Sequence, residues 1–158
     1  QLVIRQNRAL QAMEIYHHLL GPETRVDEDL GAYLADHQVL KFVVFDEQAE
    51  ATQRWSQWAG PLAHVSRTHH LLVEGTAPGI DKGVGVQRLI EHLQLDPARV
   101  LAVGDNFNDL PMFKVAGTSV AMGQSPEQVR LAADWVAPSF EEDGVAAALT
   151  HFILDARI

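Results

Sequence analysis

Two aspartates, Asp105 and Asp109, stand four residues apart directly after a short apolar run, at a spacing that could hold a metal ion. The run, residues 100–103, is long enough for one buried parallel strand, and it ends at Gly104. A carboxylate at the carboxyl end of such a strand lies where open α/β sheets place their ligand sites. Two carboxylates on a strand-to-helix turn suit Mg²⁺, which takes one or two of them and completes its shell with water and substrate phosphate.

The same pair of aspartates also fits a purely structural role. Asp105 could cap the helix that follows, and Asp109 could interact favourably with the dipole of its first turn. The two carboxylates alone do not separate metal binding from capping, so both interpretations stay open at this point.

A lysine, Lys82, begins the amphipathic segment 82–95 directly after Asp81, which can cap it. The helix dipole disfavours a cation in the first turn, so the position of Lys82 indicates a negative group nearby. A phosphate held at the helix N-terminus is the economical explanation. A solvated surface lysine is the alternative when Lys82 is considered by itself.

Alternating helix and strand patterns surround these residues and would position them. We expect helices over 82–95, 110–115, 126–133 and 144–154, and strands over 100–103, 119–122 and 135–136. Ser125 is expected to cap the helix that begins at Pro126. Helices and strands alternating at this spacing indicate parallel strands joined by crossovers, which is half of a Rossmann-like sheet.

The first part of the chain has a different pattern. We expect a helix over about 2–20, a short helix within 23–36, a strand over 39–45, a helix over 47–58, and strands over 62–65 and 70–73. This is a modest α+β arrangement. A turn cluster at 76–79 predicts the boundary between two domains, 1–78 and 79–158.

Composition limits the function classes. The chain has 158 residues, 47% of them hydrophobic, which is enough for one ordinary domain or two small lobes. Twelve basic against twenty-one acidic residues give a net charge of −9, which disfavours nucleic-acid binding. The absence of cysteine excludes disulfides and thiol catalysis. No signal peptide or membrane-length apolar run is present, so we expect a soluble, cytoplasmic protein with no membrane partner.

Several motifs occur in a recognisable order. They are Gly79-Ile-Asp-Lys-Gly83, Val103-Gly-Asp-Asn-Phe-Asn-Asp-Leu-Pro-Met112, Val120-Ala-Met-Gly123, Ala132-Ala-Asp134 and Glu142-Asp-Gly-Val145. With these motifs, residues 80–149 resemble the C-terminal half of a haloacid dehalogenase (HAD) superfamily phosphatase of the Cof-type branch. Residues 40–74 resemble the closing part of a type IIB cap. The resemblance implies an α/β fold: the C-terminal half of a HAD Rossmann-like parallel-sheet core, plus part of an α+β cap.

The same resemblance implies an activity, the Mg²⁺-dependent hydrolysis of a small phosphorylated metabolite, a sugar or cofactor phosphate, through an aspartyl-phosphate. Lys82 matches the basic residue that steadies the nucleophile and the transferring phosphoryl group. Asp105 and Asp109 match the Mg²⁺ ligands. Asn108 lies where a side-chain amide can orient metal ligands or phosphate.

One family element has no match in this sequence, the strand ending in Asp-x-Asp-x-Thr whose first aspartate is the nucleophile. Asp27 and Asp29 have the spacing, but no buried strand precedes them. Asp46 follows a strand, but Gln48 stands where the second aspartate is needed. The chain also begins at Gln1, without an initiator methionine. We therefore expect the C-terminal part of a longer protein, inactive alone, whose exposed core is covered by a missing N-terminal segment or by self-association.

Two other interpretations compete with the enzyme. A non-catalytic HAD-like remnant could act as a binding or interaction module, because truncation leaves strand edges and apolar faces that need a partner. A receiver-like or sugar-binding Rossmann domain would share the sheet. It does not explain Lys82 together with the spacing of Asp105 and Asp109, and the sequence has no Gly-rich phosphate loop to support it.

Overall fold

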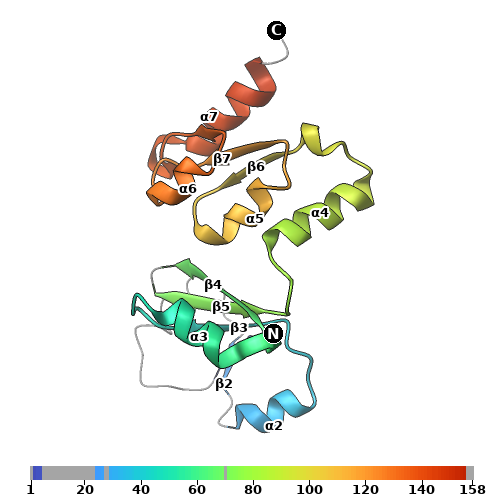
Figure 1. The fold of residues 1–158 in the computed structure, drawn as a ribbon, viewed down its shortest axis with the longest axis vertical. Coiled ribbons are helices and arrows are strands. Elements are labelled where there is room, and N and C mark those ends of the chain that lie inside the picture. The colour runs from blue at the N-terminus through green and yellow to red at the C-terminus, as the bar shows by residue number, and fades with distance from the viewer. Residues whose placement is uncertain (1, 5–23, 27–28, 70, 156–158) are drawn as a thin grey trace.

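A computed structural model describes residues 2–4, 24–26, 29–69 and 71–155 of the chain. The described residues form two regions stacked along the long axis of the molecule and joined by residues 77–81 (Figure 1). We call the region that ends at Thr76 the lower region and the one that begins at Lys82 the upper region. None of the helices in the described ranges is long and apolar enough to cross a membrane.

The lower region contains an antiparallel three-stranded sheet with one helix packed on it, a second short helix and a separate parallel pair of strands. Its elements are β1 (Leu2–Ile4), β2 (Thr24–Val26), α2 (Leu30–Ala35), β3 (Lys41–Phe45), α3 (Ala51–Ala59), a 3₁₀ turn (Gly60–Leu62), β4 (His64–His69) and β5 (Leu72–Thr76). The strands β3, β5 and β4 pair in that order, and α3 packs against β4 and β5. This matches the α+β arrangement expected from the sequence.

The predicted helix over residues 2–20 is wrong at its beginning. Residues 2–4 form β1, which pairs in parallel with β2. Three consecutive apolar residues, two of them β-branched, suit a strand. The hydrogen-bond partner of this strand is β2, which is distant in the sequence. The remainder of that predicted helix lies outside the described residues.

The upper region alternates helices and strands. Its elements are α4 (Lys82–Leu93), a 3₁₀ turn (Pro97–Arg99), β6 (Leu101–Gly104), the 3₁₀ turn η3 (Phe107–Asp109), α5 (Leu110–Phe113), β7 (Thr118–Ala121), α6 (Glu127–Leu131), β8 (Trp135–Val136), a 3₁₀ turn (Phe140–Glu142), α7 (Gly144–Leu149) and a π-helical turn (Thr150–Leu154). The sheet is parallel, in the order β6-β7-β8. The parallel half-sheet predicted from the alternating pattern is therefore confirmed.

Apolar side chains pack on both faces of this parallel sheet. One cluster combines Ala102, Phe113, Ala121 and Val129, and the other combines Val120, Met122, Ala137 and Ala148. Neighbouring residues in β7 belong to opposite clusters because side chains alternate along a strand. Burial on both faces explains why the strands read as continuous apolar runs in the sequence.

The predicted cap of α6 is also wrong. The helix begins at Glu127 after Pro126, and no side chain makes a capping hydrogen bond. The Ser125 N–H donates to the carbonyl of Met122 at 3.0 Å, which places Ser125 in the turn before the helix. Its hydroxyl is buried without a hydrogen-bond partner in the described structure.

Candidate active site

The loop after β6 folds the second predicted aspartate back onto the first. Asp109 lies so close to Gly104 that a Cβ on Gly104 would be 2.5 Å from the Cβ of Asp109. Only a residue without a side chain fits at that strand end. The glycine that ends the predicted strand is thus what allows Asp109 to fold back.

The carboxylate of Asp109 organises this loop. Only 2% of the residue is exposed, and its Oδ2 accepts backbone N–H bonds from Asp105 at 2.9 Å and Asn106 at 3.0 Å. Asn106 and Asp109 form a capping box at η3, in which Asn106 Oδ1 also accepts from the Phe107 N–H at 2.8 Å. Asp105 is therefore not the N-cap, because Asn106 takes that position, whereas Asp109 lies in the first turn as the dipole interpretation expects.

Lys82 reaches the same carboxylate from α4. Its Nζ forms an ion pair with Oδ1 of Asp109, 27 residues away in sequence. Asp81 caps α4 by accepting from the Val84 N–H at 2.8 Å, and a Cβ on Gly83 would lie 2.6 Å from the carbonyl oxygen of Pro111. The close approach of α4 to α5 brings Lys82 to the loop, and the negative group beside this cation is Asp109.

Two side chains of the loop have oxygen atoms without a hydrogen-bond or ion-pair partner in the described part of the chain. Asp105 is exposed, and its carboxylate has no hydrogen bond or ion pair to any residue in the described part of the chain. The buried amide oxygen of Asn108 likewise has no partner there. Asp109 has used three of about four lone-pair sites, so one remains on Oδ1.

These leftover oxygens fit Mg²⁺. The ion is bound by hard oxygen ligands, needs only one or two carboxylates, and keeps several waters. The unpartnered Asn108 oxygen, buried in the same 3₁₀ turn as Asp109, is the kind of acceptor that a cation or a bound donor would satisfy. Among the described residues no group of three or more His or acidic side chains gathers at one point, so these oxygens by themselves do not make a complete set of metal ligands.

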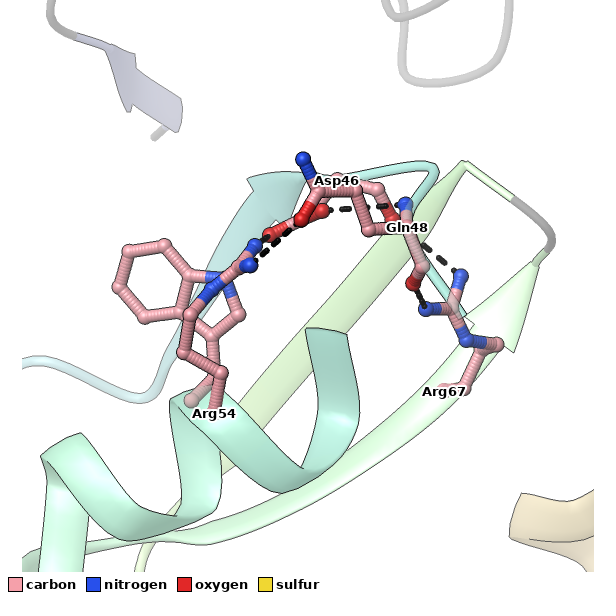
Figure 2. Close-up of polar contacts among 5 residues, drawn as sticks. Asp46, Gln48, Arg54 and Arg67 are labelled. Atoms are coloured by element: carbon pink, nitrogen blue, oxygen red, sulfur yellow. Dashed lines mark hydrogen bonds and ion pairs between the residues drawn. The ribbon is translucent and has the colours of Figure 1, made fainter. Parts of the chain in front are cut away.

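The aspartate after β3 has a different environment (Figure 2). Oδ2 of Asp46 accepts from Trp55 Nε1 at 2.9 Å and pairs with the Arg54 guanidinium, and Oδ1 accepts from the Gln48 N–H at 3.2 Å. These bonds, that from Trp55 foremost, lower the pKa of the Asp46 carboxyl. Asp46 is a structural residue of this turn, which supports rejecting it as the nucleophile.

Arg67 fastens the same turn to β4, and sequence reasoning missed it. Its guanidinium donates to the carbonyl of Asp46 at 3.2 Å and to that of Gln48 at 2.6 Å. The predicted strand stopped at residue 65, so Arg67 fell outside any element. The one sequence signal for Arg67 was a positively charged residue between two apolar strand patterns.

The other pair of aspartates rejected as the nucleophile, Asp27 and Asp29, is described only in part. Asp29 caps α2 by accepting from the Ala32 N–H at 3.0 Å, and Asp27 lies outside the described residues.

An apolar cavity of about 390 Å³ lies away from the carboxylates. Its walls include Phe42, Trp58, Leu62 and Ala63, and Lys41 is the one charged residue that lines it. Ala63 precedes the first residue of β4, whereas the loop after β6 contacts the other end of that strand. The cavity is therefore separate from the candidate site.

Comparisons with known proteins identify a matching family model and several relatives. A family model described as haloacid dehalogenase-like hydrolase matches residues 8–149. The chain is 30% identical over 135 residues to the chloroplastic endoribonuclease YBEY of Arabidopsis thaliana, covering 83% of this chain and 23% of that protein. It is 39% identical over 82 residues to the 5-amino-6-(5-phospho-D-ribitylamino)uracil phosphatase YcsE of Bacillus subtilis strain 168, covering 52% and 33% respectively.

A solved structure shares the fold. The structure of a HAD subclass IIB sugar phosphatase superposes with a TM-score of 0.79 at 24% identity, over 95% of this chain and 56% of that one. The chain thus spans from about a quarter to a third of these curated relatives and about half of this structure. The likeness confirms the predicted fold class, a mixed α/β chain whose parallel sheet matches that of HAD Rossmann-like structures.

Proposed function

Because the chain belongs to the haloacid dehalogenase-like hydrolase family, we propose that it is part of a Mg²⁺-dependent phosphatase acting through an aspartyl-phosphate. The observation that carries this proposal is the Lys82–Asp109 ion pair beside the exposed carboxylate of Asp105 at the carboxyl end of β6. The substrate is a small phosphorylated metabolite, a sugar or cofactor phosphate. The names of two relatives, a phosphatase of a ribityl phosphate and a sugar phosphatase, support that class.

Each residue of the loop has a distinct role in this proposal. Asp105 binds Mg²⁺, and Asp109 holds Lys82 in place while keeping one lone-pair site for the metal. Asn108 directs its unpartnered amide oxygen to the metal or to a metal-bound water, and its amide N–H can donate to a phosphate oxygen. When bound, Mg²⁺ offsets the charge that develops on the phosphoryl oxygens.

Lys82 acts on the same charge. Half of its side chain is exposed, although its ammonium is paired with Asp109. An ammonium has three donors, so it can hold Asp109 with one and a phosphoryl oxygen with another. A fixed cation aimed at the developing charge is the largest contribution available to such a reaction.

The nucleophile is proposed to lie outside these 158 residues. No Asp-x-Asp-x-Thr follows a strand in the sequence, and Asp29 and Asp46 both serve local structure. Within the described sheet β6 pairs only with β7, so its other edge is where a further strand would carry the nucleophile next to Asp105. The exposed apolar side chains of Leu89, Leu131 and Phe140 support a covering segment or a second copy. We expect the 158-residue chain alone to hydrolyse phosphate esters negligibly.

The decisive experiment substitutes Asp105→Asn in the full-length protein and measures Mg²⁺-dependent hydrolysis of a panel of sugar and cofactor phosphates. We expect turnover to fall at least about 100-fold, as for loss of a group that stabilises transition-state charge. Stability should change by less than about 0.5 kcal/mol because Asp105 is exposed. Glu141→Gln, an exposed acidic position on a 3₁₀ turn, is the matched control.

Two outcomes would contradict the proposal. One is an Asp105→Asn variant that retains full Mg²⁺-dependent turnover. The other is a full-length protein that binds phosphate esters and never turns them over, which would instead favour the non-catalytic remnant.

A further inference from the structure

One side chain of the candidate site, Asn106, reaches the lower region. Its Nδ2 donates to the backbone carbonyl of Thr68 at 3.0 Å, across 38 residues of sequence. Thr68 lies near the end of β4, the strand on the side of the lower region that faces the upper one (Figure 1). The loop that carries the predicted metal ligands is thereby tied to the other half of the molecule.

Asn106 is also fixed to the site itself. Its backbone N–H donates to Oδ2 of Asp109 at 3.0 Å, and its Oδ1 accepts from the Phe107 N–H at 2.8 Å. Both ends of the carboxamide are therefore used, one for the cap of η3 and one for β4. A movement of β4 would act directly on the loop that holds Asp109.

The contact between β4 and η3 leaves polar atoms unused on both sides. The Thr68 hydroxyl and the Asn108 amide oxygen are two of the three buried side-chain atoms without a partner in the described part of the chain. Buried polar groups are nearly always hydrogen-bonded, so atoms left over at one contact indicate that a polar ligand or water satisfies them in another state. Residues 77–81 join the regions, and Gly79 there has φ of +70° and open space around it.

We propose that Asn106 is a positioning residue that latches β4 onto the loop of Asp105 and Asp109, so that the lower region closes over a bound phosphate ester. The proposal rests on the proposed function for the identity of the ligand. The hydrogen bond between Asn106 and Thr68 joins the two regions whatever the ligand is. Closing excludes water and completes a site, so loss of the latch acts on substrate capture. Breaking one neutral hydrogen bond should raise KM by about 3- to 10-fold, with a smaller change in kcat.

The matched substitution is Asn106→Ser. Serine keeps an oxygen that can cap η3, since Asn and Ser are similarly good N-caps, but it has no amide donor to reach Thr68. Thr68→Ser is the control, because it keeps both the backbone carbonyl that accepts the latch hydrogen bond and the side-chain hydroxyl. Asn106→Asp, which also keeps the capping oxygen and loses the donor, replaces Asn106→Ser if that variant does not fold.

The test measures the distance between the two regions. These 158 residues contain no cysteine, so Gln57→Cys on α3 and Gln128→Cys on α6 add two thiols for spin labels, and any cysteine elsewhere in the full-length protein is replaced by serine. In the full-length protein with this pair, we expect a single narrow distance distribution that Thr68→Ser leaves unchanged. Asn106→Ser should broaden it toward longer distances and raise KM for the phosphate ester.

The outcomes separate the latch from the enzyme. An unchanged distribution in Asn106→Ser overturns the latch even if the protein is an active phosphatase. A broadened distribution in a protein without phosphatase activity supports the latch and refutes the proposed function. A broadened distribution with unchanged KM overturns the role of the latch in substrate capture.

Discussion

Two strands of this protein, β3 and β6, end beside an aspartate that is paired with a cation, and only one of them builds a candidate active site. Asp46 and Asp109 are both mostly buried, with 9% and 3% of their side chains exposed, and both accept backbone N–H bonds. After β3 the partners in Figure 2 account for both carboxylate oxygens. After β6 the side-chain oxygens of Asp105 and Asn108 have no partner in the described part of the chain.

The difference lies in what each turn leaves available for a ligand. The guanidinium groups of Arg54 and Arg67 each donate to two oxygens of the turn after β3, which is the two-pronged geometry that the planar fork of arginine favours. Lys82 is a compact charge with donors to spare, on a side chain that is half exposed. A carboxylate after a strand is therefore a weak sign of function, and unused donors and acceptors around it are a stronger one.

The largest effect should come from Asp109→Ala. It leaves the N–H groups of Asp105 and Asn106 without their acceptor and Lys82 without its partner. We expect a loss of about 2–4 kcal/mol in the free energy of unfolding, measured by urea denaturation, and loss of phosphatase activity in the full-length protein. Asp109→Asn keeps an oxygen acceptor and should retain part of the stability. A stable Asp109→Ala variant would show that the turn does not depend on this carboxylate.

A pair of glycine substitutions in α4 tests the close approach that brings Lys82 to the site. Gly83→Ala places a Cβ against the carbonyl of Pro111, so we expect a loss of about 1–3 kcal/mol in the free energy of unfolding. Gly85→Ala meets nothing within 4 Å and should stabilise the helix by about 0.5–1 kcal/mol. Both values come from the same denaturation experiment. Equal effects at the two positions would contradict the packing of α4 on α5.

Arg67→Met tests whether the turn after β3 is structural only. It removes two hydrogen bonds to the carbonyls of Asp46 and Gln48, which should cost about 1–2 kcal/mol of stability. Mg²⁺ dependence and kcat of the full-length protein should not change, because the upper region holds the site residues. Arg88→Met, at an exposed position of α4, is the control for loss of a positive charge. A large fall in kcat would place this turn in the reaction and break the comparison.

The smallest effect concerns acid stability. Hydrogen bonds, from Trp55 to Asp46 and from Ser119 to Asp134, lower the pKa of both carboxyls from 3.8. A lowered pKa in the folded state means stability that is fully present above pH 3.8 and is lost as the pH falls through the folded pKa. The free energy of unfolding should therefore decline below about pH 4. Asp134→Asn should flatten that decline, and an unchanged acid limb would show that Asp134 does not contribute to it.

Local pattern alone predicted much of the upper region. The apolar run before Gly104, the amphipathic segment after Asp81 and the alternation that follows them indicated the parallel sheet and its site-bearing edge. Burial on both faces of β6 and β7 imposes such runs on the sequence, so they can be read without coordinates. The helix predicted for residues 2–20 failed at its start because the hydrogen-bond partner of β1 is non-local.

Only the tertiary structure decided how the candidate site is arranged. The sequence placed Lys82, Asp105, Asn108 and Asp109 at strand and helix ends, but it did not distinguish the two aspartates as metal ligands. The fold separates them, burying Asp109 against Lys82 and leaving Asp105 exposed. It also joins Asn106 to Thr68 and Arg67 to the turn after β3. These pairs span 38 and 21 residues, and periodicity reports which face a residue occupies, not which distant group it meets.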